Sequence, residues 1–162
     1  MTDPVREYPD APRVGVGAVV LDGPRVLLVQ RGRPPGEGKW SIPGGLVHLG
    51  ERLEDAVMRE VEEECGVRVA LLGVCGVIDR VVYDEAAGAP ARPAIRYHWV
   101  IIDYAARVAG GRLEVGSDAA DARWVPVAEL DRYDTTAGIA DMVRRAVGVR
   151  DATLPPEGGG GR

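Results

Sequence analysis

The feature that most constrains this chain is an acidic stretch of 23 residues, GLVHLGERLEDAVMREVEEECGV, at positions 45–67. Within it, Glu60, Glu63 and Glu64 recur at the spacing that places side chains on one face of an α-helix. Three carboxylates on one helical face repel each other and weaken the helix unless something compensates. Carboxylate oxygens are the ligands that Mg²⁺ or Mn²⁺ selects. The stretch therefore predicts a helix that presents a divalent metal site.

The other side of the same predicted helix is apolar. Leu53, Ala56, Val57 and Val61 follow the helical period, so we expect this side to dock on a hydrophobic core. Gly66 comes directly after the last helical residues, where a left-handed backbone conformation favours glycine. The stretch therefore predicts an amphipathic helix that ends before this glycine.

Arg59 is the one basic residue among the acidic ones on this predicted helix. It is adjacent to Glu60 and one turn from Glu63, so we expect its guanidinium to orient a carboxylate through a charge-assisted pair. A run of charges usually marks a solvated helix face. That reading explains neither this arginine nor the position of Glu51 and the flanking glycines.

The same residues carry a family resemblance. The stretch resembles the Nudix box at every specified position of that motif, which here are Gly45, Glu51, Arg59, Glu60, Val61, Glu63, Glu64, Gly66 and Val67. The resemblance implies the Nudix fold, an α/β/α sandwich with a mixed β-sheet. It also implies a hydrolase that cuts within the diphosphate of a nucleoside diphosphate linked to another group.

The resemblance assigns roles to the motif residues. Glu60, Glu63 and Glu64 would bind Mg²⁺ or Mn²⁺, and the carbonyl of Gly44 would join the metal shell. Glu63 or Glu64 would alternatively hold the attacking water. Glu51 would support the metal shell or a second metal through water. Divalent ions neutralise the charge on a diphosphate and lower the pKa of bound water, which is the chemistry such a reaction needs.

A general base outside the motif is a separate expectation. Asp121 precedes Trp124 at a spacing that resembles the late acidic residue of the family, so Asp121 is the candidate. Asp118 is on the same segment, but an Asx turn or a cap is the simpler role for it. Asp84 and Glu85 are further candidates.

Four residues are candidates for contacts with substrate. Arg31 and Arg33 border a Gly/Pro loop at 32–39 and would bind phosphates, or else they are solvated loop charges. Trp40 would stack on a base, although core packing is the commoner use of a buried tryptophan. Tyr83 is near the position where diadenosine-polyphosphate hydrolases often carry a tyrosine.

The substrate is less constrained than the reaction. Overall the chain resembles bacterial ADP-ribose pyrophosphatase-like proteins, which ranks ADP-ribose or a nucleotide sugar first, although Val82 replaces the proline that often marks those enzymes. A MutT-like (d)NTP pyrophosphohydrolase or a diadenosine-polyphosphate hydrolase comes second. A non-catalytic nucleotide sensor ranks lower, because the glutamates are all kept and no DNA-binding module is evident. The resemblance also implies a homodimer.

Composition limits the partners. The net charge of −5 at pH 7 argues against a nucleic-acid-binding surface, RNA decapping included, because such a surface is basic. No apolar run has the length of a membrane span, so we expect no membrane contact. The two cysteines fit no zinc motif, and the N-terminus has no signal peptide, so we expect a cytoplasmic protein.

The rest of the chain reads as one domain. We expect a flexible N-terminal arm at 1–12, the Nudix hydrolase domain at 13–149 and a disordered tail at 150–162. Between these ends, patterning predicts strands at 14–21 and 25–31, and one or two strands over 68–82 that are broken near Gly73 or Gly76. An insertion at 83–94, a strand at 95–104, a loop at 106–120 and a short strand at 122–125 follow. The chain then forms a turn or single helical turn at 126–130 and a final helix to about Val147, capped by Thr135 or Thr136.

Overall fold

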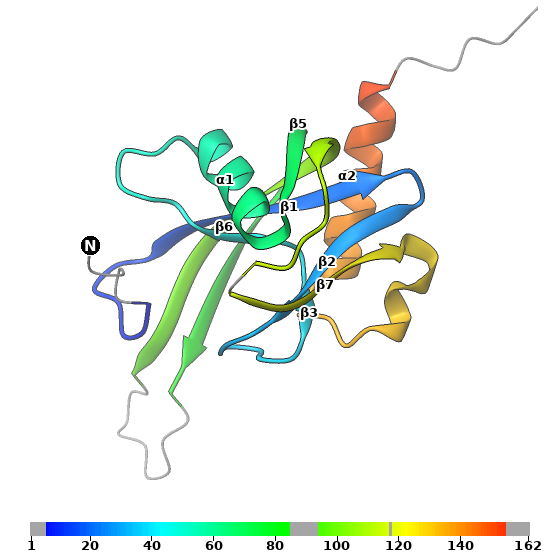
Figure 1. Cartoon of the computed structure of the whole chain (residues 1–162). Helices are drawn as coiled ribbons and strands as arrows, with labels where there is room; N and C mark the ends of the chain where they lie inside the picture. Colours follow the sequence, from blue (N-terminus) through cyan, green and yellow to red (C-terminus); the bar gives the residue numbers. More distant parts are fainter. Residues whose placement is uncertain (1–5, 85–93, 117, 155–162) are drawn as a thin grey trace, which may run out of the picture.

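The computed structural model describes residues 6–84, 94–116 and 118–154. Within them, one mixed sheet has the strand order β3-β2-β1-β6-β5, with β4 beside β1 and β7 beside β2 (Figure 1). The pair β1 and β6 is parallel, and the other pairs are antiparallel. In chain order the elements are β1 (Arg13–Asp22), β2 (Arg25–Arg31), β3 (Trp40–Ser41), β4 (Gly44–Leu46), α1 (Leu53–Cys65), β5 (Val67–Tyr83), β6 (Ile95–Gly111), β7 (Ala119–Pro126), the 3₁₀ helix η1 (Val127–Arg132) and α2 (Ile139–Thr153).

Strand β1 explains why both faces of the sheet are covered. Successive side chains on a strand point to opposite faces. Ala18 and Val20 pack in the core beneath α1, whereas Val19 and Leu21 pack in a second core beneath α2. All four are buried, so the strand is apolar on both sides and needs a helix on each. This confirms the predicted mixed sheet with helices on its two faces.

Helix α1 forms as the apolar spacing predicts. Ala56, Val57, Val61 and Cys65 are buried against the sheet. The helix ends at Gly66, whose φ of 68° places it in the left-handed region that favours glycine. The burial of one side leaves the acidic side of α1 facing away from the core.

The hairpin of β5 and β6 is longer than expected. Residues 68–82 belong to one strand, which has irregularities of register on either side of Gly73 rather than a break. The loop expected at 106–120 is wrong in its first part, because β6 continues to Gly111. The backbone there pairs with β5 up to Gly111, and with the end of β1 only as far as Arg107. Most of the expected 83–94 insertion, residues 85–93, lies outside the described part.

The start of α2 differs from the prediction. Gly138 precedes the helix in a left-handed conformation with a φ of 86°, and no side chain caps the helix. The expected cap by Thr135 or Thr136 is therefore wrong. The backbone N–H of Thr136 instead donates to the carbonyl of Trp40 at 2.9 Å, and its hydroxyl donates to Ser41 at 3.4 Å. Thr136 therefore ties the start of α2 to β3.

The ends of the described chain are ordered by contacts with the domain. Glu7, within the expected N-terminal arm, accepts hydrogen bonds from Arg96 at 2.8 Å and from Tyr97 at 2.5 Å, both on β6. Helix α2 continues to Thr153, so residues 150–153 of the expected tail are helical, and residues 155–162 lie outside the description. No described helix combines the length and apolarity that crossing a bilayer requires.

The sheet opens between β1 and β2. Their register joins them only at the hairpin, around Leu21 and Asp22. Closer to its start, β1 pairs with β4 instead, from Gly15 to Gly17, and the N–H of Ala18 donates to the carbonyl of Pro43 at 2.9 Å. The two halves of the sheet therefore separate, and a cavity occupies the space between them.

Candidate active site

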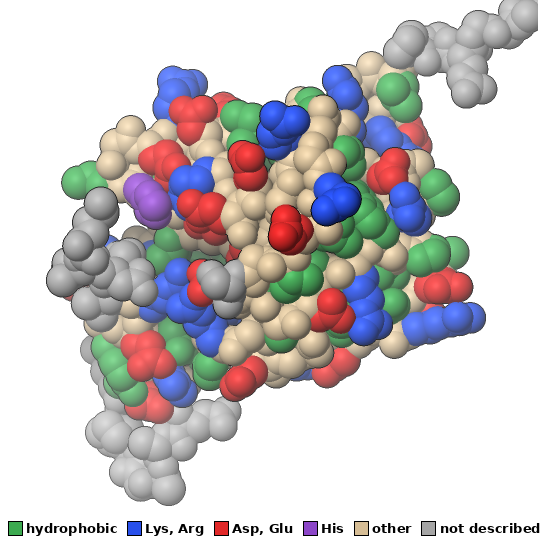
Figure 2. Space-filling view, in the orientation of Figure 1, with side chains coloured by type: hydrophobic (Ala, Val, Ile, Leu, Met, Phe, Trp, Pro, Cys, Tyr) green, Lys and Arg blue, Asp and Glu red, His purple; other side chains and the backbone are tan. Residues whose placement is uncertain are grey.

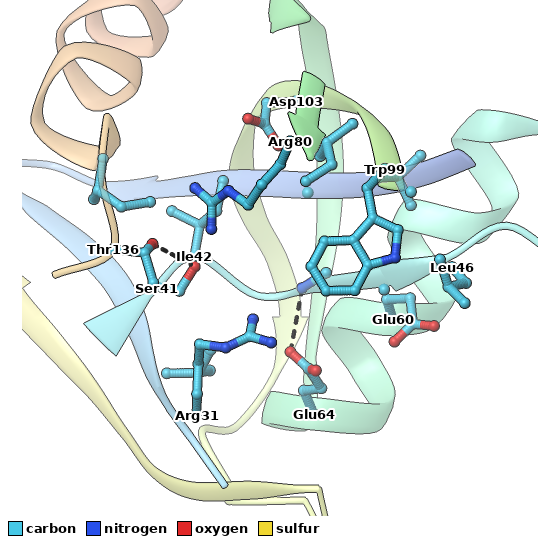
Figure 3. A pocket seen from close by; sticks show the side chains of 18 of the residues that line it. Arg31, Ser41, Ile42, Leu46, Glu60, Glu64, Arg80, Trp99, Asp103 and Thr136 are labelled. Carbon is cyan, nitrogen blue, oxygen red and sulfur yellow. Dashed lines mark hydrogen bonds between the residues drawn. The ribbon is translucent and has the colours of Figure 1, made fainter. Parts of the chain in front are cut away.

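One cavity of about 420 Å³ lies at this opening. Its lining comes from α1, from the strands on both sides of the opening and from the start of α2 (Figure 3). Figure 2 shows the hollow beneath α1, with acidic and basic side chains beside it. A volume of a few hundred cubic ångströms suits a small-molecule ligand. The acidic side of α1 thus faces a cavity of nucleotide size.

Glu60 and Glu64 reach the cavity from α1. The carboxylate of Glu60 packs on the bare Cα of Gly45, where an added Cβ would overlap it. Oε2 of Glu64 accepts a hydrogen bond from the N–H of Gly44 at 3.2 Å. Burial, together with the nearby charge of Glu60, raises the pKa of Glu64 to about 7. Glu63 also borders the cavity, but its side chain is more exposed.

Arg59 connects three of the carboxylates. Its Nε and Nη2 donate to the two oxygens of Glu51 at 2.7 and 3.0 Å, which is a bidentate pair. Its Nη1 donates to Glu60 at 2.9 Å and to Glu63 at 3.1 Å. The Arg59 guanidinium lowers the pKa of Glu51 to about 2. Arg59 and Glu51 together therefore fix how Glu60 and Glu63 are presented.

The donor set at this end fits a hard divalent cation. The carboxylates of Glu60 and Glu64 are close enough for one to raise the pKa of the other, and both lie beside the glycine backbone of β4. Among the described residues, no three acidic, histidine or cysteine side chains converge on one point as metal ligands would. Arg59 instead bonds to Glu60 and Glu63 directly. Carboxylate and carbonyl oxygens are what Mg²⁺ and Mn²⁺ select, so the residue types match.

Two predicted substrate contacts line the same cavity. Arg31 is partly buried, and its Nε donates to the carbonyl of Pro35 at 2.7 Å. Burial lowers the pKa of Arg31 from its ordinary value. Arg33 also lines the cavity and pairs with Asp118, with 2.6 Å between Nη2 and Oδ1. Both guanidinium groups are placed to meet an anion.

Three other predicted residues do not line the cavity in the described part of the chain. Trp40 is 8% exposed and packs in the core beneath α2, edge-on to Tyr133 at 5.3 Å, so it offers no stacking face to a ligand. Asp121 pairs with Arg123 at 2.9 Å and accepts from the next N–H of its own strand. Tyr83 is exposed at the far end of β5.

The cavity also contains residues that the sequence analysis did not select. Arg80 on β5 and Trp99 and Asp103 on β6 also line it. Figure 3 shows Trp99 beside Leu46 and Glu60, and Arg80 and Asp103 farther from the glutamates. Asp103 is 3% exposed, and burial raises its pKa to about 6. Strand alternation was the available signal, because Trp99, Ile101 and Asp103 share one face. An aspartate inside an apolar strand is unusual and marks a candidate.

Comparisons with known proteins identify the family of this chain. A family model described as NUDIX domain matches residues 11–146. The ADP-ribose pyrophosphatase of Methanocaldococcus jannaschii is 31% identical over 135 residues, which cover 82% of this chain and 74% of that protein. The putative 8-oxo-dGTP diphosphatase 2 of Mycobacterium tuberculosis is 36% identical over 138 residues, covering 82% and 89%. The crystal structure of a MutT NUDIX hydrolase from Burkholderia pseudomallei superposes with a TM-score of 0.66 at 28% identity, covering 84% of this chain and 98% of that one.

Proposed function

Because this chain belongs to the Nudix family and is a Nudix hydrolase, we propose that it hydrolyses the diphosphate of a nucleoside diphosphate linked to another group, with ADP-ribose or a nucleotide sugar as the first candidate. The products would be a nucleoside monophosphate and a phosphorylated second product. One observation carries the proposal: a single cavity brings the carboxylates of α1 together with Arg31 and Arg33.

The acidic end of the cavity would hold the metal. Nudix hydrolases generally depend on divalent metal ions, and we propose Mg²⁺ or Mn²⁺ here. Glu60, Glu63 and Glu64 would be the ligands, with the carbonyl of Gly44, and Glu51 would support the shell. A bound ion supplies neutralisation of phosphate charge and a lowered pKa of water.

The protein's own groups would orient the substrate and move the proton. Arg31 and Arg33 would bind the diphosphate, since guanidinium groups match phosphate oxygens. Arg59 holds Glu51, Glu60 and Glu63 in fixed positions, which spares the site a rearrangement during reaction. Glu63 or Glu64 would alternatively hold the attacking water and accept its proton, in which case that carboxylate would act on the water instead of binding the ion.

A second candidate is a MutT-like (d)NTP pyrophosphohydrolase. The mycobacterial relative bears the name of such an enzyme, and the matched region covers 89% of it. The two functions share the acidic end of the cavity and differ in what the rest of the cavity holds. A homodimer and a cytoplasmic location stay predictions.

Product analysis by chromatography tests the proposal. The purified protein is incubated with Mg²⁺, and separately with Mn²⁺, in the presence of ADP-ribose, a nucleotide sugar, a diadenosine polyphosphate or each dNTP. We expect AMP and ribose phosphate from ADP-ribose, and Glu64→Gln should abolish turnover. Glu62→Gln is the matched control, because Glu62 is exposed on the same helix and does not line the cavity.

Each other outcome contradicts a different part of the proposal. Pyrophosphate and a nucleoside monophosphate from dNTPs would move the protein to the MutT-like reading. Full activity in Glu64→Gln would refute the site. Binding of nucleotides without any turnover would indicate a sensor.

A further inference from the structure

The N-terminal arm contributes a residue to the cavity that the proposed reaction does not use. Arg6 lines the cavity and is partly buried. The proposed phosphate contacts, Arg31 and Arg33, come from the end of β2 and the loop after it. Arg6 brings a further guanidinium to the same cavity from a different part of the chain. The arm is therefore part of the wall of this cavity.

A set of hydrogen bonds, here called the clasp, fixes the arm on the hairpin of β5 and β6. Glu7 accepts from Arg96 at 2.8 and 3.2 Å and from the hydroxyl of Tyr97 at 2.5 Å. The N–H of Tyr8 donates to the carbonyl of Arg96 at 2.8 Å, and its hydroxyl donates to Asp84 at 2.6 Å. Tyr8 has a φ of 52°, which is unfavourable for a residue with a side chain. The clasp holds the arm in a conformation that it would not adopt by itself.

The clasp meets β6 on the face that lines the cavity. Tyr97 and Trp99 are two residues apart and share this face, with 5.1 Å between their ring centroids. Trp99 lines the cavity, and Figure 3 shows it beside Glu60. Because Glu7 bonds to Tyr97, the neighbouring Arg6 enters the cavity at this end of β6.

Arg6 does not serve the fold as other arginines of the domain do. Its Nε is buried and has no hydrogen-bond partner. Arg59 and Arg96, by contrast, each make two or more hydrogen bonds to carboxylates. An unpaired buried donor lowers stability, so a structural arginine normally has its buried donors paired. A ligand therefore explains the placement of Arg6 better than the fold does.

The positive charges of the cavity act on one another. Burial, followed by the charge of Arg80, lowers the pKa of Arg31, and the charges of Arg6 and Arg33 lower it further, against the effect of Glu64. Arg6 is thus close enough to Arg31 for the two guanidinium groups to repel each other. An anion bound between them would replace this repulsion by attraction to both.

We propose that Arg6 binds the phosphate groups of the substrate together with Arg31, and that Glu7 is the positioning residue that holds Arg6 in the cavity. The inference rests on the proposed function, since it names a further contact to that substrate. The fork of a guanidinium matches phosphate oxygens, and two such forks can bind one diphosphate from two sides. The N-terminal arm then belongs to the active site although it lies outside the Nudix motif.

Arg6→Gln tests the phosphate contact. The ligand is the analogue of ADP-ribose with a methylene group in place of the oxygen between its two phosphorus atoms, which cannot be cut there. Its dissociation constant is measured by calorimetry on the whole protein with Mg²⁺. Loss of a charged hydrogen bond should weaken binding about 10- to 100-fold. Arg132→Gln is the matched control, because Arg132 is exposed on η1 and does not line the cavity.

Adenosine separates this contact from general damage to the site. Adenosine has no phosphate, so Arg6→Gln should leave its affinity unchanged while the affinity for the analogue falls. Equal weakening of both ligands, or an unaltered affinity for the analogue, would overturn the proposal.

Glu7→Ala tests the positioning role. Without the Glu7 carboxylate the clasp loses its bonds to Arg96 and Tyr97, so affinity for the analogue should fall toward that of Arg6→Gln. The double variant should bind no more weakly than Arg6→Gln alone, because Glu7 acts through Arg6. A lowered Tm with unaltered affinity, or losses that add in the double variant, would assign Glu7 to the fold alone and contradict the proposal.

Failure of the proposed function has a different signature. If ADP-ribose is hydrolysed and Arg6→Gln leaves kcat/KM unchanged, the reaction stands and the role of Arg6 does not. If nothing is hydrolysed but Arg6→Gln still weakens binding of the analogue, the role of Arg6 stands and the reaction does not. An original protein that does not bind the analogue would overturn both.

Discussion

Burial of Asp103 makes the stability of this protein depend on pH in a way that one substitution should remove. The pKa of Asp103 rises from 3.8 to about 6 because the carboxylate is desolvated. The folded state therefore binds more protons than the unfolded state between these values. The stabilisation is fully present below pH 3.8 and is lost as pH rises through about 6. Asp103→Asn, which does not titrate, should lack this loss.

The size of the effect follows from the pKa difference. About two pH units at 1.36 kcal/mol each give about 3 kcal/mol in full, of which about 2 kcal/mol falls between pH 4.5 and 7.5. The substitution by Asn also lowers the free energy of unfolding, because its amide is buried, but it lowers it equally at both pH values. The quantity to compare is therefore the change in unfolding free energy between the two pH values.

Urea denaturation at pH 4.5 and 7.5, with chelator and without nucleotide, measures this quantity. Between pH 4.5 and pH 7.5, the free energy of unfolding of the original protein should fall by about 2 kcal/mol more than that of Asp103→Asn. Other titrating groups, Glu64 included, contribute to both proteins and cancel in the comparison. Asp79, an exposed aspartate on β5, is the matched control, and Asp79→Asn should behave like the original protein. Equal losses in the original protein and in Asp103→Asn would refute the reasoning that Asp103 is buried and unpaired.

Three further predictions concern the acidic end of the cavity. Arg59→Lys should lower kcat at least about tenfold with the fold kept, because an ammonium cannot make the bidentate pair and the two other bonds; circular dichroism and kinetics check this. Gly45→Ala should reduce activity by pushing the Glu60 carboxylate aside, whereas Gly148→Ala, with open space around it, should leave kinetics unchanged. Apparent Mn²⁺ affinity should rise with pH up to about 7 and then level off, because the proton on Glu64 must leave; calorimetry in Glu64→Gln should lack this rise.

Helix α1 was predictable from the sequence because its signals are local. The apolar spacing of α1 and the glycine after it depend on the helix itself, and both agree with the structure. The extent of β6 was not readable. Glycines at 110 and 111 and small residues before them resemble a loop, yet pairing with the start of β5 extends the strand through them. Tertiary pairing overrode the local composition.

The cavity residues on β5 and β6 were missed for a related reason. Trp40 was selected because it precedes the glycines that lead to the acidic helix, but nearness in sequence did not place its side chain in the cavity. Asp103 lies far from the motif in sequence and enters the cavity because β6 pairs with β1 beside Gly17. Such a position depends on strand order, which a reading of single segments does not supply.

The opening between β1 and β2 lets side chains from both faces of the sheet line one cavity. The glutamates of α1 reach the cavity from one side of the sheet, and Arg80, Trp99 and Asp103 reach it from the other. A substitution beneath α2 is therefore expected to change that side of the cavity while α1 keeps its packing on its own core.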